Sequence, residues 1–200
     1  MPEVWPDCLA GGNRWGLAAP GGLLLFAPRP KPQPAPLGLF AVIRYAGFVE
    51  LEPLQPGSRA PAIWSIDFSA GPTVLFFYKV TCPVCQMAAA PASRFEEAYP
   101  GRIQGIGQDP EEKLAEFDRT YGLGFPSIAD LPPYEVSNAY GIRTVPTTFL
   151  ADTDGSIRDL AESWDRDGLN RLSKELASLL DAEFATISEP SDGLPPFRPG

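Results

Sequence analysis

The sequence predicts an α/β fold in which helices flank a mixed central sheet. Short apolar runs rich in β-branched and aromatic residues alternate with longer amphipathic segments, a pattern typical of parallel strands joined by helical crossovers. Two later apolar runs flank the turn sequence Asp152-Thr153-Asp154-Gly155, which predicts a hairpin. The hairpin would add antiparallel strands to an otherwise parallel sheet.

The first strand and helix are predicted most strongly. Residues 73–78, Thr-Val-Leu-Phe-Phe-Tyr, form a continuous apolar run that suits a central strand buried on both faces. The helix that follows should extend to about Tyr99, with Thr81 or Cys82 at its N-cap and Pro83 in its first turn. Pro100-Gly101 would end it.

The remaining elements follow in order. Residues 102–107 read as a second strand, and Asp109 is expected to cap a helix over 111–121. A short extended segment at 126–129 precedes a short helix at 135–140. The hairpin strands are expected at 147–151 and 156–160, and leucines at i, i+3, i+4 spacing predict an amphipathic helix over 166–184.

Composition divides the chain into three parts. Residues 1–50 are rich in Pro and Gly and are expected to be a disordered extension, residues 51–184 the folded domain, and residues 185–200 a disordered tail. The apolar runs of the extension are far shorter than the ~20 residues of a membrane span, so no span is expected. The first residues lack a basic start, so a signal peptide is not expected. The cytoplasm is therefore the default location, with export to the periplasm as the alternative.

Composition also excludes several classes of function. Acidic residues outnumber basic ones by 25 to 16, which argues against nucleic-acid binding. The absence of His excludes Ser-His and Cys-His catalysis and imidazole metal sites. Cys8 lies far from the other two cysteines, so four zinc ligands cannot be assembled. No metal and no organic cofactor are expected.

The pair Cys82-Pro83-Val84-Cys85 is the strongest functional signal. At the junction of a buried strand and a helix, the first thiol meets the unpaired N–H groups of the helix terminus, which favour thiolate and lower a Cys pKa. The second thiol, one turn further on, could attack a mixed disulfide. This placement predicts a redox-active dithiol with Cys82 as nucleophile and Cys85 as resolving thiol.

Two segments resemble the thioredoxin-like proteins. Residues 76–85 are similar to the active-site strand and turn of that family, and residues 140–150 to its segment with an invariant cis-proline, here Pro146. Ile106-Gly107-Gln108-Asp109 and Asp154-Gly155 are closest to the redoxin or TlpA-like branch, which is related to AhpC/TSA proteins. The resemblance implies a thioredoxin-like fold and antioxidant or cell-redox activity.

The resemblance also implies how substrate would bind. Val145 and Pro146 would form an edge that pairs with an extended substrate segment, flanked by Thr81 and Pro83. The implied substrate is a disulfide-containing protein or a small thiol compound, and the electron donor is not identified. A monomer is expected. The sequence departs from thioredoxins proper in having Thr81 instead of Trp before the first cysteine and Phe76 instead of a buried acid.

Three functions stay open at this level. The first is a thiol–disulfide oxidoreductase that reduces or exchanges disulfides. The second is a peroxiredoxin-like thiol peroxidase, for which Lys79 stands where a Thr is expected and Arg143 lies three residues before the expected Arg position. The third is a non-catalytic, redox-sensitive binding module.

Overall fold

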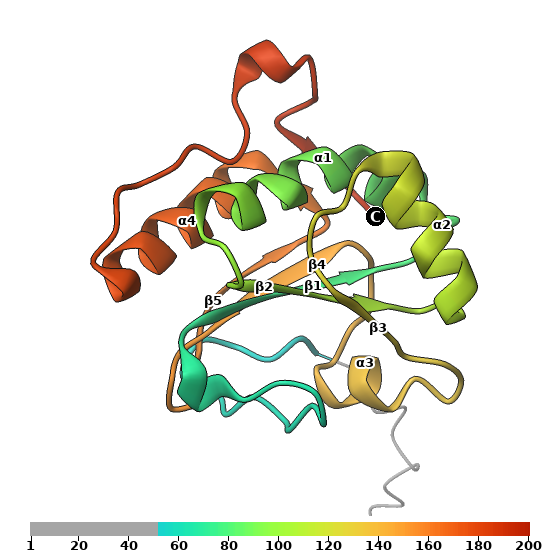
Figure 1. Ribbon diagram of the computed structural model, residues 1–200, viewed down its shortest axis with the longest axis horizontal. Helices are drawn as coiled ribbons and strands as arrows, with labels where there is room; N and C mark the ends of the chain where they lie inside the picture. The colour runs from blue at the N-terminus through green and yellow to red at the C-terminus, as the bar shows by residue number, and fades with distance from the viewer. Residues whose placement is uncertain (1–51) are drawn as a thin grey trace, which may run out of the picture. The chain divides into compact units, whose positions relative to one another are not determined.

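A mixed five-stranded sheet forms the centre of the computed structural model, which describes residues 52–200 (Figure 1). The strand order is β3-β2-β1-β4-β5. The strands are β1 (Thr73–Tyr78), β2 (Ile103–Gly107), β3 (Ser127–Ala129), β4 (Thr147–Ala151) and β5 (Ile157–Glu162), and the helices are α1 (Pro83–Ala98), α2 (Glu111–Tyr121), α3 (Glu135–Ala139) and α4 (Arg166–Leu180). The predictions for residues 1–50 and for Cys8 lie outside the described residues.

The sheet topology confirms the predicted mixture of parallel and antiparallel pairs. β1 is parallel to β2 and β2 to β3, whereas β4 is antiparallel to both β1 and β5. β1 therefore lies in the middle, and its residues from Val74 to Tyr78 are buried. The continuous apolar run predicts this position because a central strand presents side chains to a core on each face.

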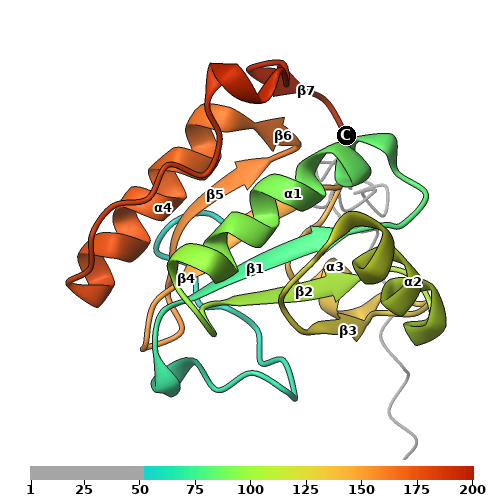
Figure 2. The ribbon, with the colours of Figure 1, turned by 45° about the horizontal axis from the view of Figure 1, so that its top comes forward.

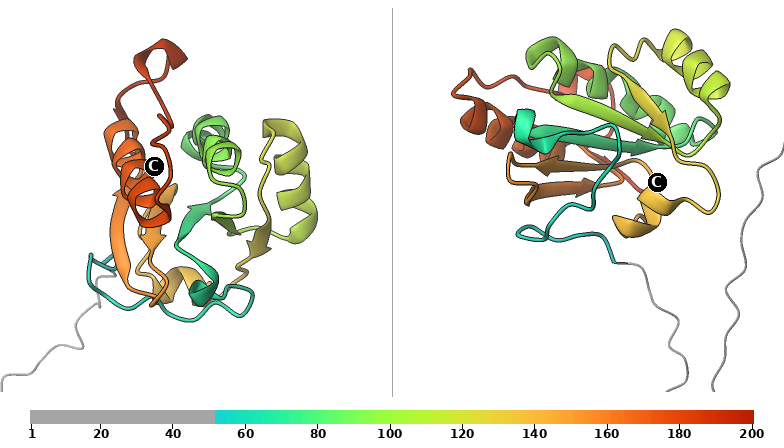
Figure 3. Two further views of the ribbon diagram at one scale, coloured as in Figure 1. Left: turned by 60° about the vertical axis from the view of Figure 1, so that its left-hand side comes forward. Right: turned by 60° about the horizontal axis from the view of Figure 1, so that its bottom comes forward.

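Two cores lie on opposite faces of the sheet. Val74, Phe76 and Tyr78 face helices α1, α2 and α4, whereas Leu75 and Phe77 face Ile63 and Tyr140 on the other side. Figures 1 and 3 show α1, α2 and α4 on one face and α3 with the segment before β1 on the other. Within residues 52–200 no helix combines the length and apolarity that a membrane crossing requires.

The cap predicted for α2 is wrong. The N-cap of α2 is Pro110, and no side chain caps it. Asp109 is buried and its carboxylate instead accepts a hydrogen bond from the Val80 N–H at 2.9 Å. The Val80 N–H, just after β1, binds the carboxylate that the local sequence pattern assigned to the helix cap. This contact forms because strands β1 and β2 end side by side.

The predicted disorder of residues 185–200 is also wrong. These residues contain a 3₁₀ turn, η2 (Pro190–Asp192), and strand β7 (Phe197–Arg198), which pairs with β6 (Trp164–Asp165). Ile187 is 0% exposed, and Asp192 forms a bidentate ion pair with Arg94 of α1. The segment has no periodicity of its own because its order comes from partners on α1 and α4. The folded part therefore continues past residue 184.

Candidate active site

Cys82 caps the first turn of α1. Its sulfur accepts a hydrogen bond from the Cys85 N–H at 3.3 Å, and its carbonyl accepts the first helical bond from the Gln86 N–H. Pro83 occupies the first helical position, where its missing N–H leaves no bond unmade. Cys82 is half-buried, while Thr81 and Pro83 on either side are exposed. The sulfur is therefore held by a backbone donor at the start of the helix and is still partly exposed.

Cys85 lies in the core beneath Cys82. Its side chain is 0% exposed, and both cysteines are free thiols. Burial raises the pKa of the Cys85 thiol far above its ordinary value, and the neighbouring Cys82 and the Asp109 carboxylate raise it further. The two thiols thus differ in access, and burial keeps Cys85 neutral at physiological pH.

The peptide before Pro146 faces the first thiol. The Val145–Pro146 peptide bond is cis, as the resemblance implies, and the Cys82 thiol donates a hydrogen bond to the Val145 carbonyl at 3.4 Å. Within residues 52–200 the Val145 N–H donates to no acceptor. The Thr147 hydroxyl donates to the Thr144 carbonyl and fixes this loop at the start of β4. The fold thus brings together two motifs 63 residues apart.

Polar groups beneath the turn support the first cysteine. The Asp109 carboxylate holds the Val80 N–H, and the Gln86 side-chain amide donates to the Val80 carbonyl at 2.9 Å. Both backbone groups of Val80 are therefore fixed two residues before Cys82. The sequence analysis missed these roles because Asp109 follows β2, whereas the cysteine turn follows β1. An acidic residue at the end of the neighbouring strand could have indicated such a contact.

The comparisons with known proteins agree with this arrangement. Residues 62–160 match the model of the AhpC/TSA family. The fold is that of the thioredoxin domain of a thiol-disulfide oxidoreductase from Bacteroides vulgatus, with a TM-score of 0.53, 22% identity, and coverage of 62% of this chain and 99% of that one. Residues 62–160 are therefore similar to the AhpC/TSA family, and the fold is thioredoxin-like.

Two of the similar curated proteins are named thiol-disulfide oxidoreductases. The chain is 36% identical over 100 residues to the thiol-disulfide oxidoreductase ResA of Geobacillus thermodenitrificans, covering 47% of the chain and 56% of ResA. The ResA of Halalkalibacterium halodurans is 33% identical over 89 residues, covering 42% of the chain and 49% of that protein. The chain thus spans about half the length of the curated relatives it matches.

Lys79 and Arg143, the two charged residues considered for a peroxidase, contact other side chains. The Lys79 ammonium lies 5.9 Å from the centroid of the Tyr134 ring, a cation–π distance. Arg143 forms ion pairs with Glu52 at 3.0 Å and with Glu162 at 3.8 Å. Phe76 packs in the core against α1, where thioredoxins proper carry a buried acid. Asp109 is the buried carboxylate nearest in the chain to this turn.

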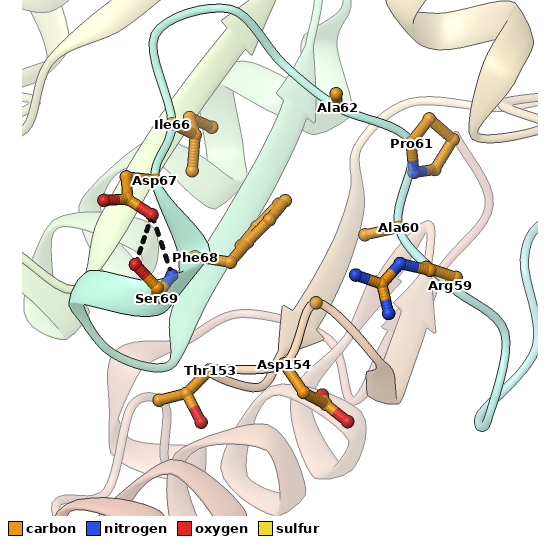
Figure 4. A pocket seen from close by; sticks show the side chains of 11 residues that line it. Arg59, Ala60, Pro61, Ala62, Ile66, Asp67, Phe68, Ser69, Thr153 and Asp154 are labelled. Carbon is orange, nitrogen blue, oxygen red and sulfur yellow. Dashed lines mark hydrogen bonds between the residues drawn. The ribbon is translucent and has the colours of Figure 1, made fainter.

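Two cavities differ in their relation to the thiols. One of about 290 Å³ borders Val80 and Thr81 and is walled by Phe117 and Tyr121 of α2. A larger one, of about 590 Å³, lies at the other end of β1 and β4, where Arg59, Phe68 and Asp154 line it (Figure 4). Figure 4 also shows the Asp67 carboxylate bound to Ser69. Only the smaller cavity adjoins the cysteine turn.

Proposed function

We propose that this domain is a thiol–disulfide oxidoreductase with Cys82 as nucleophile and Cys85 as resolving thiol. Val145 and Pro146 form the substrate-docking edge, with Thr81 and Pro83 at its exposed rim. The observation that carries the proposal is the half-exposed Cys82 sulfur, held 3.3 Å from the Cys85 N–H and 3.4 Å from the Val145 carbonyl. The names of the ResA relatives support the same activity.

The exchange proceeds in two balanced steps. The Cys82 thiolate attacks one sulfur of the substrate disulfide, forms a mixed disulfide and releases the other substrate sulfur as a thiolate. Cys85 then passes its proton to the substrate thiolate released in the first step and attacks the Cys82 sulfur, which forms the Cys82–Cys85 disulfide and releases the second substrate sulfur as a thiolate. Two electrons pass to the substrate, and a separate dithiol donor must restore the reduced pair.

The different environments of the two thiols suit these roles. Cys82 can meet substrate because it is half-buried at the surface, whereas Cys85 is enclosed and protonated. A resolving thiol held neutral does not compete for the substrate, and it reacts once the mixed disulfide lies next to it. The free Val145 N–H offers a bond to an extended substrate segment.

Trapping of the mixed disulfide tests the proposal. Reduced wild-type protein should reduce insulin disulfides, Cys82→Ser should not, and Cys85→Ser should accumulate a covalent adduct through Cys82 that mass spectrometry detects. Thr120→Ser, an exposed and conservative change on α2, serves as the matched control and should behave as wild type. An adduct on Cys85, or full activity of Cys82→Ser, would refute the assignment.

Hydrogen peroxide separates this function from a thiol peroxidase. The Arg143 ion pairs with Glu52 and Glu162 favour the oxidoreductase, because a peroxidase needs its guanidinium turned toward the reacting sulfur. We expect the second-order rate constant of Cys82 with peroxide to match that of free cysteine. A rate constant several orders of magnitude higher would instead assign peroxidase activity.

A further inference from the structure

The last residues of the folded segment lie against the docking edge. A Cβ added to Gly200 would overlap the Val145 carbonyl oxygen and would also meet the Thr144 hydroxyl. The same Val145 carbonyl accepts the hydrogen bond of the Cys82 thiol. Only a glycine therefore fits where the chain presses on the loop that the proposed substrate would need.

A series of hydrogen bonds leads the chain to this place. The Trp164 indole N–H donates to the Pro195 carbonyl at 2.6 Å, and the Arg166 N–H donates to the Pro196 carbonyl at 3.0 Å. β7 then pairs antiparallel with β6, and the Gly200 N–H donates to the Ser163 hydroxyl at 3.1 Å. Figure 2 shows this path from η2 past β6 to the C-terminal end. We call residues 197–200 the strap.

The strap and its anchor are held with different strength. The anchor, residues 187–192, has the buried Ile187 and the Arg94–Asp192 ion pair. All four strap residues are exposed, and Phe197 is 57% exposed. Since the strap buries little apolar surface, its release costs a few hydrogen bonds that water can replace. The anchor can therefore stay in place while the strap lifts.

We propose that the strap sets the substrate class by covering the Val145 edge against extended polypeptides while it leaves Cys82 open to small disulfides. The inference rests on the proposed function and adds a selectivity to it. A small disulfide can approach Cys82 past the exposed Thr81 and Pro83. A polypeptide that pairs with Val145 must first displace Gly200.

The size of the selectivity depends on the fraction of molecules in which the strap is closed. When a binding-competent state is only a fraction of the population, the apparent affinity falls by that fraction. A strap closed for about nine-tenths of the time lowers the rate constant for an extended peptide about tenfold. The rate constant for a small disulfide does not change, because that substrate does not use the covered edge.

Two substrates with one leaving group test the proposal. Reduced full-length protein is mixed with 5,5′-dithiobis(2-nitrobenzoate), or with an unstructured peptide whose single Cys carries the same thionitrobenzoate group. Release of thionitrobenzoate gives both second-order rate constants. Deletion of residues 197–200 should raise the peptide rate constant about tenfold. Gly200→Ala should raise it several-fold, because the added methyl group overlaps Val145. Neither variant should alter the rate constant for the small disulfide.

The controls keep the outcomes apart. Ser191→Ala changes an exposed residue of the same segment, and should leave both rate constants unchanged. Thermal unfolding midpoints check that both strap variants fold. The strap proposal fails if the peptide-to-small-disulfide ratio stays at the wild-type value in both strap variants, or if both rate constants change by one common factor. Failure of the wild type to react with the small disulfide would instead overturn the proposed function itself.

Discussion

The cysteine turn and the C-terminal segment are held in place by different kinds of contact. The hydrogen bonds of Cys82 within its own turn join it to Lys79, Cys85 and Gln86, all within four residues. Residues 187–200 instead bond to Arg94, Asn170 and Trp164, at least 17 residues away. The turn can form wherever its strand and helix form, whereas the segment needs α1 and α4 already packed together.

The comparison predicts where a distant change will act. Contacts close in sequence are formed early and lost late, whereas contacts between distant residues are lost together when one partner is removed. Variants of the anchor should therefore loosen residues 187–200 and leave the cysteine turn intact. The four predictions below run from the largest expected effect to the smallest.

Removal of the buried anchor side chain should have the largest effect. Ile187→Ala deletes a fully buried side chain and should lower the free energy of unfolding by about 2–5 kcal/mol. Hydrogen exchange should increase over residues 185–200 and stay unchanged over the first turn of α1. Ser191→Ala, an exposed change in the same segment, is the control. An equal increase in hydrogen exchange over residues 185–200 and over the first turn of α1 would contradict this difference between the two regions.

Alkylation should separate the two thiols by at least about a hundredfold. Burial raises the pKa of Cys85 and also excludes reagent, so iodoacetamide at pH ~8 should modify Cys82 first. The preference should persist in Ile187→Ala, since the turn is held by its own bonds. Mass spectrometry of digested protein measures both sites. Similar rates at the two cysteines in the wild type would contradict the buried position of Cys85.

Loss of the ion pair at the anchor should cost about 1 kcal/mol at neutral pH, since water screens the partly exposed Arg94. The Arg94 guanidinium holds the pKa of Asp192 well below its ordinary value of about 3.9. A lowered folded-state pKa means that the stabilisation is present above pH ~4 and is lost as the pH falls further.

Urea unfolding at pH ~6 and pH ~3 measures this acid dependence. Asp192→Asn should be less stable than wild type at the higher pH, and the difference should shrink at the lower one. Lys174→Met removes an exposed cation from α4 and is the control. Its difference in stability from wild type should be the same at both pH values. An acid dependence of Asp192→Asn equal to that of the wild type would assign the effect to other carboxylates.

The smallest effect is expected within the turn. Gln86→Ala removes one side-chain bond to the Val80 carbonyl and should lower stability by about 1 kcal/mol or less. The alkylation preference for Cys82 should remain, because the Cys85 N–H still caps the sulfur. Loss of that preference would show that the turn also depends on support from beyond its own backbone.

The sequence predicted the parts of the fold that local patterns specify. The strands at 73–78 and 147–151 and the helix at 111–121 have their predicted bounds, and Cys82 is the N-cap of α1. The last helix ends at Leu180 instead of 184, because Asp181 adopts a left-handed conformation that stops it. Apolar runs and caps are local signals, so one chain segment suffices to read them.

The sequence missed the features that depend on distant partners. Asp109 reads as a helix cap, yet the neighbouring end of β1 supplies Val80 as a nearer donor. Residues 185–200 carry four prolines and one fully buried apolar residue, Ile187. No hydrophobic periodicity therefore indicates that they pack against α1 and α4. The sequence gives no signal for the strap for the same reason.

The sequence alone predicted that Cys82 lies at the start of the helix and Cys85 one turn further on, because a Cys-x-x-Cys pair that follows a buried strand places its first residue at the N-terminus of the next helix. The tertiary structure decided what surrounds that pair: which carbonyl faces Cys82, which carboxylate lies beneath it, and which segment lies against the Val145 carbonyl. Hydrogen bonds within one turn follow from local geometry, whereas contacts across 29 to 63 residues exist only after the sheet has brought their partners together.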